Sequence, residues 1–123
     1  MAERVLNVSV ISPEKILYTG SATYVKIPGS DGLFGVLYNH APLVSEIDLG
    51  ILVVTNGDEI TNIYVDGGFA EIKKNTVNIL ARSGELASQV NKEEVKKRIS
   101  EISSKTDKES LLELKRLKTK LAL

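Results

Sequence analysis

The middle of the chain reads Gly50-Ile-Leu-Val-Val-Thr-Asn-Gly-Asp-Glu-Ile-Thr-Asn-Ile-Tyr-Val65. Two runs rich in β-branched residues flank Asn56-Gly57, and this dipeptide between apolar runs is the strongest short-range signal for a β-hairpin. Both central residues of such a turn have φ > 0, which Asn and Gly tolerate. The stretch therefore predicts two antiparallel strands joined by a tight turn.

The same pattern extends outward from this hairpin over residues 4–81. Leu6, Val8 and Val10 alternate with polar residues, which predicts one buried and one solvated strand face. Further short apolar runs cover residues 24–27 and 76–80, and turns are expected at 66–68 and 73–75. Many short strands with turn residues at this spacing predict an all-β sandwich or barrel.

Beyond about Gly84 the apolar residues follow the period of a helix. Asn91 can cap the first helix, and Glu94 three residues later completes a capping-box arrangement. The apolar stripe of this helix recurs at i, i+4 and i+7 and consists of Val95, Ile99 and Ile102.

A second helix follows the polar break at residues 103–105. Thr106-Asp-Lys-Glu109 is its expected capping box, and its stripe consists of Leu114, Leu117 and Leu121, widened by Leu111. Helices of about 11 and 15 residues are marginal alone in water, so this αα-hairpin must dock on the sandwich or on another protein. We therefore expect two domains, a β-sandwich over residues 1–84 and a helical hairpin over residues 85–123.

Composition narrows the function classes. The 123 residues include no cysteine, which excludes disulfides and thiolate metal sites. Residues 1–84 carry six basic and nine acidic side chains, whereas residues 85–123 carry ten basic and seven acidic ones. This mild asymmetry indicates two parts with different partners and no nucleic acid. No apolar run reaches the roughly 18 residues of a membrane span, and Met1 to Val5 resemble no leader, so we expect a cytoplasmic chain.

Two features superficially indicate chemistry. Gly29, Gly32 and Gly35 recur every three residues, but a phosphate cradle opens a helix and supplies Lys and Ser/Thr, whereas strand-like residues follow here. His40 is the only histidine, and there is no Gly-x-Ser-x-Gly elbow, so neither a catalytic triad nor a zinc site is expected. We predict no enzyme, no metal and no cofactor. A free-standing ligand-binding sandwich is the alternative, although a carbohydrate-binding module needs aromatic platforms and the chain has no Trp.

Three segments carry a family pattern. A Pro-Gly turn, Gly-x-x-Gly and His-Ala-Pro-Leu occur in Pro28-Gly-Ser-Asp-Gly-Leu-Phe-Gly-Val-Leu-Tyr-Asn-His-Ala-Pro-Leu43. An opening hairpin is matched by Val8-Ser-Val-Ile-Ser-Pro-Glu-Lys-Ile-Leu-Tyr18, and closing strands by Asp66-Gly-Gly-Phe-Ala-Glu-Ile72 and Asn75-Thr-Val-Asn-Ile-Leu-Ala81. With the C-terminal hairpin, nearly the whole chain resembles the epsilon subunits of F-type (rotary) ATP synthases.

The resemblance implies a β-sandwich of about ten short strands followed by an antiparallel two-helix hairpin. It implies a non-catalytic subunit of the central stalk, which binds the gamma subunit, touches the polar loops of the c-ring and couples its rotation to the catalytic head. The hairpin of the family can extend toward the alpha and beta subunits and inhibit ATP hydrolysis. The implied location is the cytoplasmic face of the bacterial inner membrane, as a peripheral subunit, with the stromal side of a plastid thylakoid as the alternative.

The resemblance also implies functional residues. Loops facing the c-ring would contain Gly29, Ser30, Asp31, Gly32, Leu33, Asn39 and His40. The regulatory hairpin would act through its two stripes and through Lys115, Arg116, Lys118 and Lys120. These four cations either meet an acidic loop of the catalytic beta subunits or form a solvated face that suits a helix C-terminus.

Some family members bind ATP through a motif of the form Ile/Leu-Asp-x-x-Arg-Ala. The matching stretch here is Val90-Asn-Lys-Glu-Glu-Val95, in which Asn91, Glu94 and Val95 replace Asp, Arg and Ala. A carboxylate in place of the phosphate-binding Arg reverses the local charge. The sequence therefore predicts no tight ATP binding.

Overall fold

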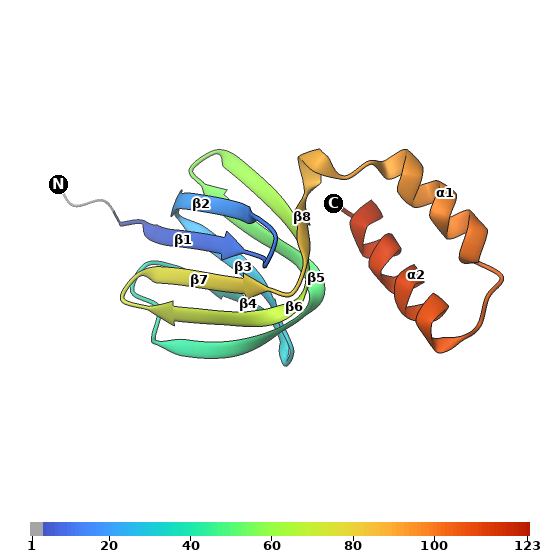
Figure 1. Ribbon diagram of the computed structural model, residues 1–123. Coiled ribbons are helices and arrows are strands. Elements are labelled where there is room, and N and C mark those ends of the chain that lie inside the picture. Colours follow the sequence, from blue (N-terminus) through green and yellow to red (C-terminus); the bar gives the residue numbers. More distant parts are fainter. Residues whose placement is uncertain (1–3) are drawn as a thin grey trace.

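The computed structural model describes residues 4–123, so Met1 to Glu3, on which part of the expectation about a leader rested, lie outside it. The described residues form eight strands and two α-helices (Figure 1). The strands are β1 (Leu6–Ile11), β2 (Ile16–Ala22), β3 (Tyr24–Gly29), β4 (Gly32–Val36), β5 (Leu43–Asn56), β6 (Glu59–Lys73), β7 (Thr76–Ala81) and β8 (Gly84–Leu86). A short 3-10 turn, η1 (Ala87–Gln89), leads to α1 (Lys92–Ile102) and α2 (Lys108–Leu121).

The strands form one continuous sheet that folds over itself into two layers. Its order is β2-β1-β7-β6-β5-β3-β4, and β8 pairs with β6 off this path. All pairs are antiparallel except β1 with β7. The sandwich of strands followed by two helices, predicted from the sequence, is confirmed.

The two long strands β5 and β6 belong to both layers. Residues 43–47 of β5 pair with residues 68–72 of β6, and residues 49–56 pair with residues 59–66. Between these blocks, Gly67 and Gly68 adopt φ values of +75° and +127°. A Cβ atom at Gly68 would collide with the carbonyl oxygen of Leu80. The first layer therefore contains β2, β1, β7 and one half of each long strand, and the second contains β4, β3, β8 and the other halves.

This bend corrects two expectations. The sequence predicts a turn at residues 66–68, but these residues lie inside β6, where the glycines bend the strand without ending it. The described part of the chain consequently has eight strands where about ten short ones were expected. The turn predicted at residues 73–75 is confirmed, with Lys74 and Asn75 at φ values of 50° and 61° between β6 and β7.

The central hairpin is confirmed, but its turn lies one residue later than predicted. Asn56 pairs with Glu59, so Gly57 and Asp58 form the two-residue loop. Gly57 has a φ of +63° and Asp58 has a negative φ, which is the pattern of a type II′ turn. The observed register sets buried Leu52 opposite buried Ile63, whereas a turn centred on Asn56-Gly57 would set Leu52 opposite Thr61. Core packing therefore selects the turn.

The core lies between the two layers. The alternation at the start of the chain is confirmed, because Leu6, Val8 and Val10 are all buried. Every buried residue of the core cluster lies in a strand, and within residues 4–123 no helical residue belongs to this cluster. The sandwich therefore holds its own hydrophobic core, as a sheet folded over itself must.

The helical hairpin has a separate, smaller apolar contact. Val95 and Ile102 are buried, and Ile99, Leu114, Leu117 and Leu121 are half-buried. Helix α1 contacts α2, and α2 is the helix that lies against β5 and β6 (Figure 1). The α1 stripe is thus covered by α2, so the two predicted stripes pack largely against each other.

The helix caps agree in part with the sequence. The Asn91 side chain accepts a hydrogen bond from the Glu94 amide at 3.2 Å, as predicted. The second cap is Asp107 instead of Thr106, and its carboxylate accepts from the Ser110 amide at 3.1 Å. These hydrogen bonds from Ser110 lower the pKa of the Asp107 carboxyl. An ionised carboxylate also suits the positive end of a helix better than a hydroxyl does.

Candidate functional site: interaction surfaces of the sandwich and the hairpin

The outer face of the first layer carries a row of apolar side chains. Direct cross-strand pairs join Phe69 to Leu80, Leu80 to Ile11, and Ile11 to Ile16. Ile16, Phe69 and Leu80 are between 55% and 68% exposed, and Ile11 is half-buried. Cross-strand neighbours lie on the same sheet face, so these four residues, the apolar row, form one contiguous surface. A contiguous exposed apolar patch on a small domain marks a protein contact.

Charged side chains border the apolar row. Glu46 pairs directly with Phe69, and a shallow pocket of about 350 Å³ beside Phe69 and Leu80 is lined by Pro13 and Arg82 as well. Sequence reasoning did not select these residues. The sequence did contain one indication of this surface. Phe69 is a large apolar residue at a position that alternates with the buried residues Ala70 and Ile72, so it belongs to the solvent-facing side of its strand.

The loop residues expected to face the c-ring do not gather in one place. Gly29 to Leu33 form the tip of the β3–β4 hairpin, where the Ser30 amide donates to the carbonyl oxygen of Glu46 at 2.9 Å. Asn39 and His40 lie in the loop between β4 and β5. Strand β4 separates the two groups, and its five residues span about 16 Å.

The loop that contains His40 is tied to the turn between β6 and β7. Asn39 has a φ of 66°, and its amide donates to Oδ1 of Asn75 at 2.6 Å. His40 Nδ1 lies 2.6 Å from the carbonyl oxygen of Ala41, and the His40 amide donates to the carbonyl oxygen of Leu37 at 3.1 Å. These bonds give the half-buried His40 a local role in turn geometry.

Polar contacts attach the hairpin to the outer face of the second layer. Arg116 Nε lies 2.7 Å from Asp66 Oδ2, at an angle that makes the contact an ion pair and not a hydrogen bond. Lys120 Nζ lies 3.4 Å from Glu85 Oε1 and 5.0 Å from the centre of the Tyr64 ring. We call these five residues the docking contacts.

The docked hairpin affects the pKa of Tyr64. The side chain is 3% exposed although it is on the outer face of its layer. Burial, followed by the negative charge of Asp66, raises the pKa of Tyr64 to about 12. The phenol of Tyr64 therefore stays neutral at pH values well below about 12.

The four C-terminal cations divide into two pairs. Arg116 and Lys120 belong to the docking contacts, whereas Lys115 and Lys118 are exposed on the same helix.

The residues at the position of the ATP-binding motif line a pocket of about 320 Å³ between the hairpin and β8. Asn91, Glu94 and Val95 all contribute to it, together with Glu85 and Lys120. Arg98 also lines this pocket, but its guanidinium donates to Glu113 at 2.6 Å and to Glu101 at 3.2 Å. These bonds raise the pKa of Arg98 and lower that of Glu113. That the chain does not bind ATP tightly stays a prediction. The carboxylates of Glu85 and Glu94, which both line the pocket, support this prediction because they would repel the phosphates.

Two further properties concern possible cofactors and membranes. Within the part of the chain that the structure describes, His, Asp and Glu do not gather in groups of three or more that could hold a metal ion. Among residues 4–123, neither helix is both long and apolar enough to cross a membrane.

A β-sandwich with an apolar row on one outer face and a docked αα-hairpin on the other defines a class of protein. Residues 5–87 match the family model described as ATP synthase, Delta/Epsilon chain, beta-sandwich domain. The ATP synthase epsilon chain of Leptospira borgpetersenii serovar Hardjo-bovis is 48% identical over 118 residues, which cover 94% of this chain and 92% of that one. The chloroplastic ATP synthase epsilon chain of Tetradesmus obliquus is 40% identical over 91 residues, or 74% and 67% of the two chains.

The chain belongs to the family of ATP synthase epsilon chains. This membership, predicted from the sequence, decides against a free-standing ligand-binding module. A chain in the Euglena gracilis mitochondrial ATP synthase has a TM-score of 0.74 and 20% identity, covering 98% of this chain and 78% of that chain. A chain in the central stalk and c-ring of the Tetrahymena thermophila mitochondrial ATP synthase has a TM-score of 0.59 and 14% identity, covering 84% and 74%. At these identities the likeness concerns the fold alone.

Proposed function

We propose that this epsilon chain is a non-catalytic subunit that binds the gamma subunit of its ATP synthase through the apolar row. The observation that carries the proposal is the contiguity of Ile11, Ile16, Phe69 and Leu80 across neighbouring strands of one outer face. The centre of a protein interface is typically apolar and includes aromatic residues, with charged residues at its rim. Glu46 and Arg82 provide such a rim.

We further propose that the tip of the β3–β4 hairpin, Gly29 to Leu33, touches the polar loops of the c-ring. The tip is exposed, and its Ser30 amide is bonded to Glu46, which borders the apolar row. A subunit that holds gamma and the c-ring at adjoining places couples their rotation. Asn39 and His40 lie at the other end of β4, so we assign them to the shape of their own loop.

The division of labour that we propose gives residues 1–84 to stalk binding and residues 85–123 to regulation. Lys115 and Lys118 are exposed while the hairpin is docked. Arg116 and Lys120 are released only when the docking contacts break. The hairpin would then reach the alpha and beta subunits with all four cations and inhibit hydrolysis. The proposed location is the cytoplasmic face of the bacterial inner membrane, as a peripheral subunit.

Co-purification with gamma tests the apolar row. The double variant Phe69→Glu, Leu80→Glu should bind gamma at least about 30-fold more weakly, because removing a central apolar anchor costs about 2 kcal/mol or more. Ile60→Glu is the matched control, since Ile60 is 65% exposed but lies on the second layer. Full-strength binding by the folded double variant would show that gamma uses another face.

A further inference from the structure

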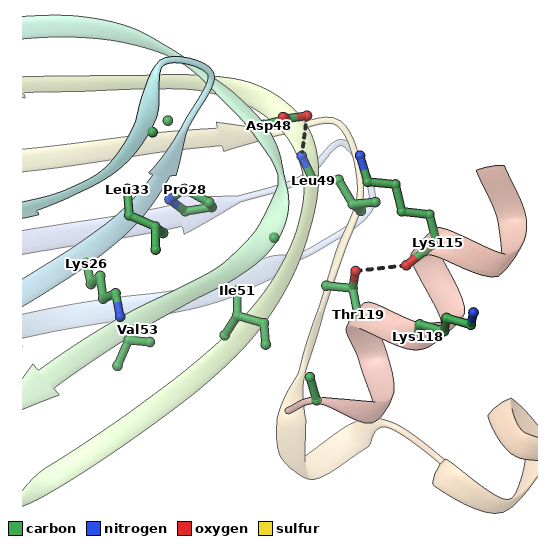
Figure 2. Close-up of a pocket in the computed structure, with 14 residues that line it drawn as sticks. Lys26, Pro28, Leu33, Asp48, Leu49, Ile51, Val53, Lys115, Lys118 and Thr119 are labelled. Atoms are coloured by element: carbon green, nitrogen blue, oxygen red, sulfur yellow. Dashed lines mark hydrogen bonds between the residues drawn. The ribbon is translucent and has the colours of Figure 1, made fainter. Parts of the chain in front are cut away.

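A groove separates α2 from the outer face of the second layer. Its volume is about 790 Å³. Pro28, Leu49, Ile51 and Val53 form its apolar floor, and Thr119 of α2 lies on the opposite wall (Figure 2). Ala122, directly after α2, also lines the groove. Binding sites for small molecules are mostly apolar, contain few polar groups and occupy roughly 300–1,000 Å³. The size and lining of the groove are within that range.

The groove exists because the hairpin is attached along one side only. The docking contacts reach Tyr64, Asp66 and Glu85, none of which lines the groove. On the sheet side, Gly50 lies against Pro28, where a Cβ atom would approach the Pro28 ring to 2.7 Å. The apolar floor is consequently left half-covered, with Leu49, Ile51 and Val53 only half-buried.

The charges that surround the groove are mainly positive. Lys26 on the sheet and Lys115 and Lys118 on α2 line it, and among residues 4–123 Asp48 is the only acidic residue that does. Figure 2 shows the Lys115 amine beside Leu49 and the Lys26 amine beside Val53, whereas the Lys118 amine points away. Within residues 4–123 none of these lysines joins a salt bridge, and the Asp48 carboxylate accepts from the Leu49 amide at 2.8 Å.

We propose that this groove binds a fatty carboxylate, with the alkyl chain on the apolar floor and the carboxylate against Lys26 or Lys115. A phosphate-bearing ligand is disfavoured, because within residues 4–123 no arginine lines the groove to bind a phosphate with two hydrogen bonds. The Thr119 hydroxyl already donates to the carbonyl oxygen of Lys115 at 2.8 Å, so the α2 wall offers few unpaired polar groups.

Occupation of the groove holds the hairpin on the sandwich, since the site has one wall on each. A ligand that binds only the docked form multiplies its population relative to the undocked form by 1 + [L]/Kd, or about 11-fold at ten times Kd. The proposal is independent of gamma, because both the groove and the hairpin belong to the isolated chain.

The test uses the full chain and a series of octanoate, decanoate and dodecanoate below their micelle concentrations. Amide chemical shifts and calorimetry measure binding, and hydrogen exchange of the α2 amides measures docking. We expect shifts at residues 49–53 and 115–122, with each added methylene tightening Kd about twofold to fourfold. Decanol, with the same chain and no charge, should bind up to about fivefold more weakly than decanoate.

Paired variants test the charged edge. Lys26→Gln with Lys115→Gln should weaken decanoate binding about fivefold, because the one screened contact of the carboxylate contributes up to about 1 kcal/mol. Lys96→Gln with Lys97→Gln is the control, since it removes the same charge from exposed positions of α1 that do not line the groove.

Three results would overturn the proposal. One is a Kd that does not change with chain length, and another is equal binding of decanoate to both paired variants. The third is a response of the groove amides to purified gamma but not to decanoate, which would make the groove a protein contact.

Discussion

Gly68 sits where β6 leaves one layer for the other, and its side chain is limited by two separate constraints. Its φ of +127° disfavours any L side chain, and a Cβ atom would also collide with Leu80. Gly32 has nearly the same φ, +125°, but open space around it. The pair therefore separates backbone strain from steric collision.

Gly68→Ala should destabilise the protein more than Gly32→Ala. We expect about 1 kcal/mol for the strain that both variants share and about 1–3 kcal/mol more for the collision at Gly68. Urea unfolding followed by circular dichroism measures the difference. Equal losses would mean that β6 relaxes around the new methyl group.

Tyr64 predicts a dependence of stability on pH. Its pKa in the folded protein, about 12, lies above the value near 10 of an unfolded chain. The stability linked to Tyr64 is therefore fully present below pH 10 and is lost as the pH rises through about 12. Between pH 10 and 12 the wild type should lose about 1–3 kcal/mol more than Tyr64→Phe, measured by unfolding at each pH. Parallel pH profiles for the two proteins would contradict this assignment.

At the scale of the element, the docking contacts attach the hairpin to the sandwich, because they bring two cations of α2 to Asp66, to Glu85 and to the buried ring of Tyr64. The stripes of α1 and α2 pack largely against each other, so Arg116 and Lys120 contribute to the docking of α2. Such partly exposed pairs contribute little individually and are screened by salt. The docked state is therefore a shallow minimum.

Arg116→Gln with Lys120→Gln should loosen this docking. We expect about a fivefold increase in hydrogen exchange of the α2 amides, which corresponds to about 1 kcal/mol. Lys115→Gln with Lys118→Gln is the matched control, because it removes the same charge from the same helix without touching a docking contact. Identical exchange in the two double variants would show that shape, and not charge, holds the hairpin.

The sequence predicts elements better than their junctions. Helix lengths, the Asn91 cap and the strand alternation at Leu6 to Val10 depend on neighbours along the chain, and these are confirmed. The turn at Gly57 and the continuity of β6 through Gly67-Gly68 depend on pairing with distant residues such as Ile63 and Leu80. Local patterns do not contain that information.

The same limit applies to the surfaces. The candidate loops around Gly29 and His40 were found as motifs, but their separation follows from the course of β4. The apolar row arises because four residues from four strands meet in register. The pairs β1–β2 and β6–β7 are consecutive in the chain, but the pairing of β1 with β7 joins segments that are far apart in the sequence. Only the three-dimensional pairing makes it visible.

At the scale of the whole molecule, the β-sandwich has a hydrophobic core to which, within residues 4–123, the helices contribute no residue. A chain that ends at Gln89 should stay folded, with the same cooperative unfolding of its sandwich and with gamma binding retained, because no helical residue within residues 4–123 belongs to the core cluster. Circular dichroism, denaturation and co-purification with gamma measure these properties. Failure to bind gamma would make the hairpin an assembly element.

A cut at residue 84 provides the comparison. It removes Glu85 and Leu86 of β8, which pair with β6, and Leu86 also packs against the core. The shorter chain should therefore unfold at a lower urea concentration than the chain ending at Gln89. Equal midpoints would mean that β8 belongs energetically to the hairpin.

Strand β6 joins the two working faces of the molecule. Asp66 pairs with Arg116 of the hairpin on the outer face of the second layer, and Phe69 lies in the apolar row on the outer face of the first layer. Gly67-Gly68 separates these two residues in the chain. If gamma binds the apolar row as we propose, torque at Phe69 would reach Asp66 through a few covalent bonds and a hydrogen-bonded ladder. Because no loop intervenes to introduce slack, the hairpin would rotate in phase with gamma.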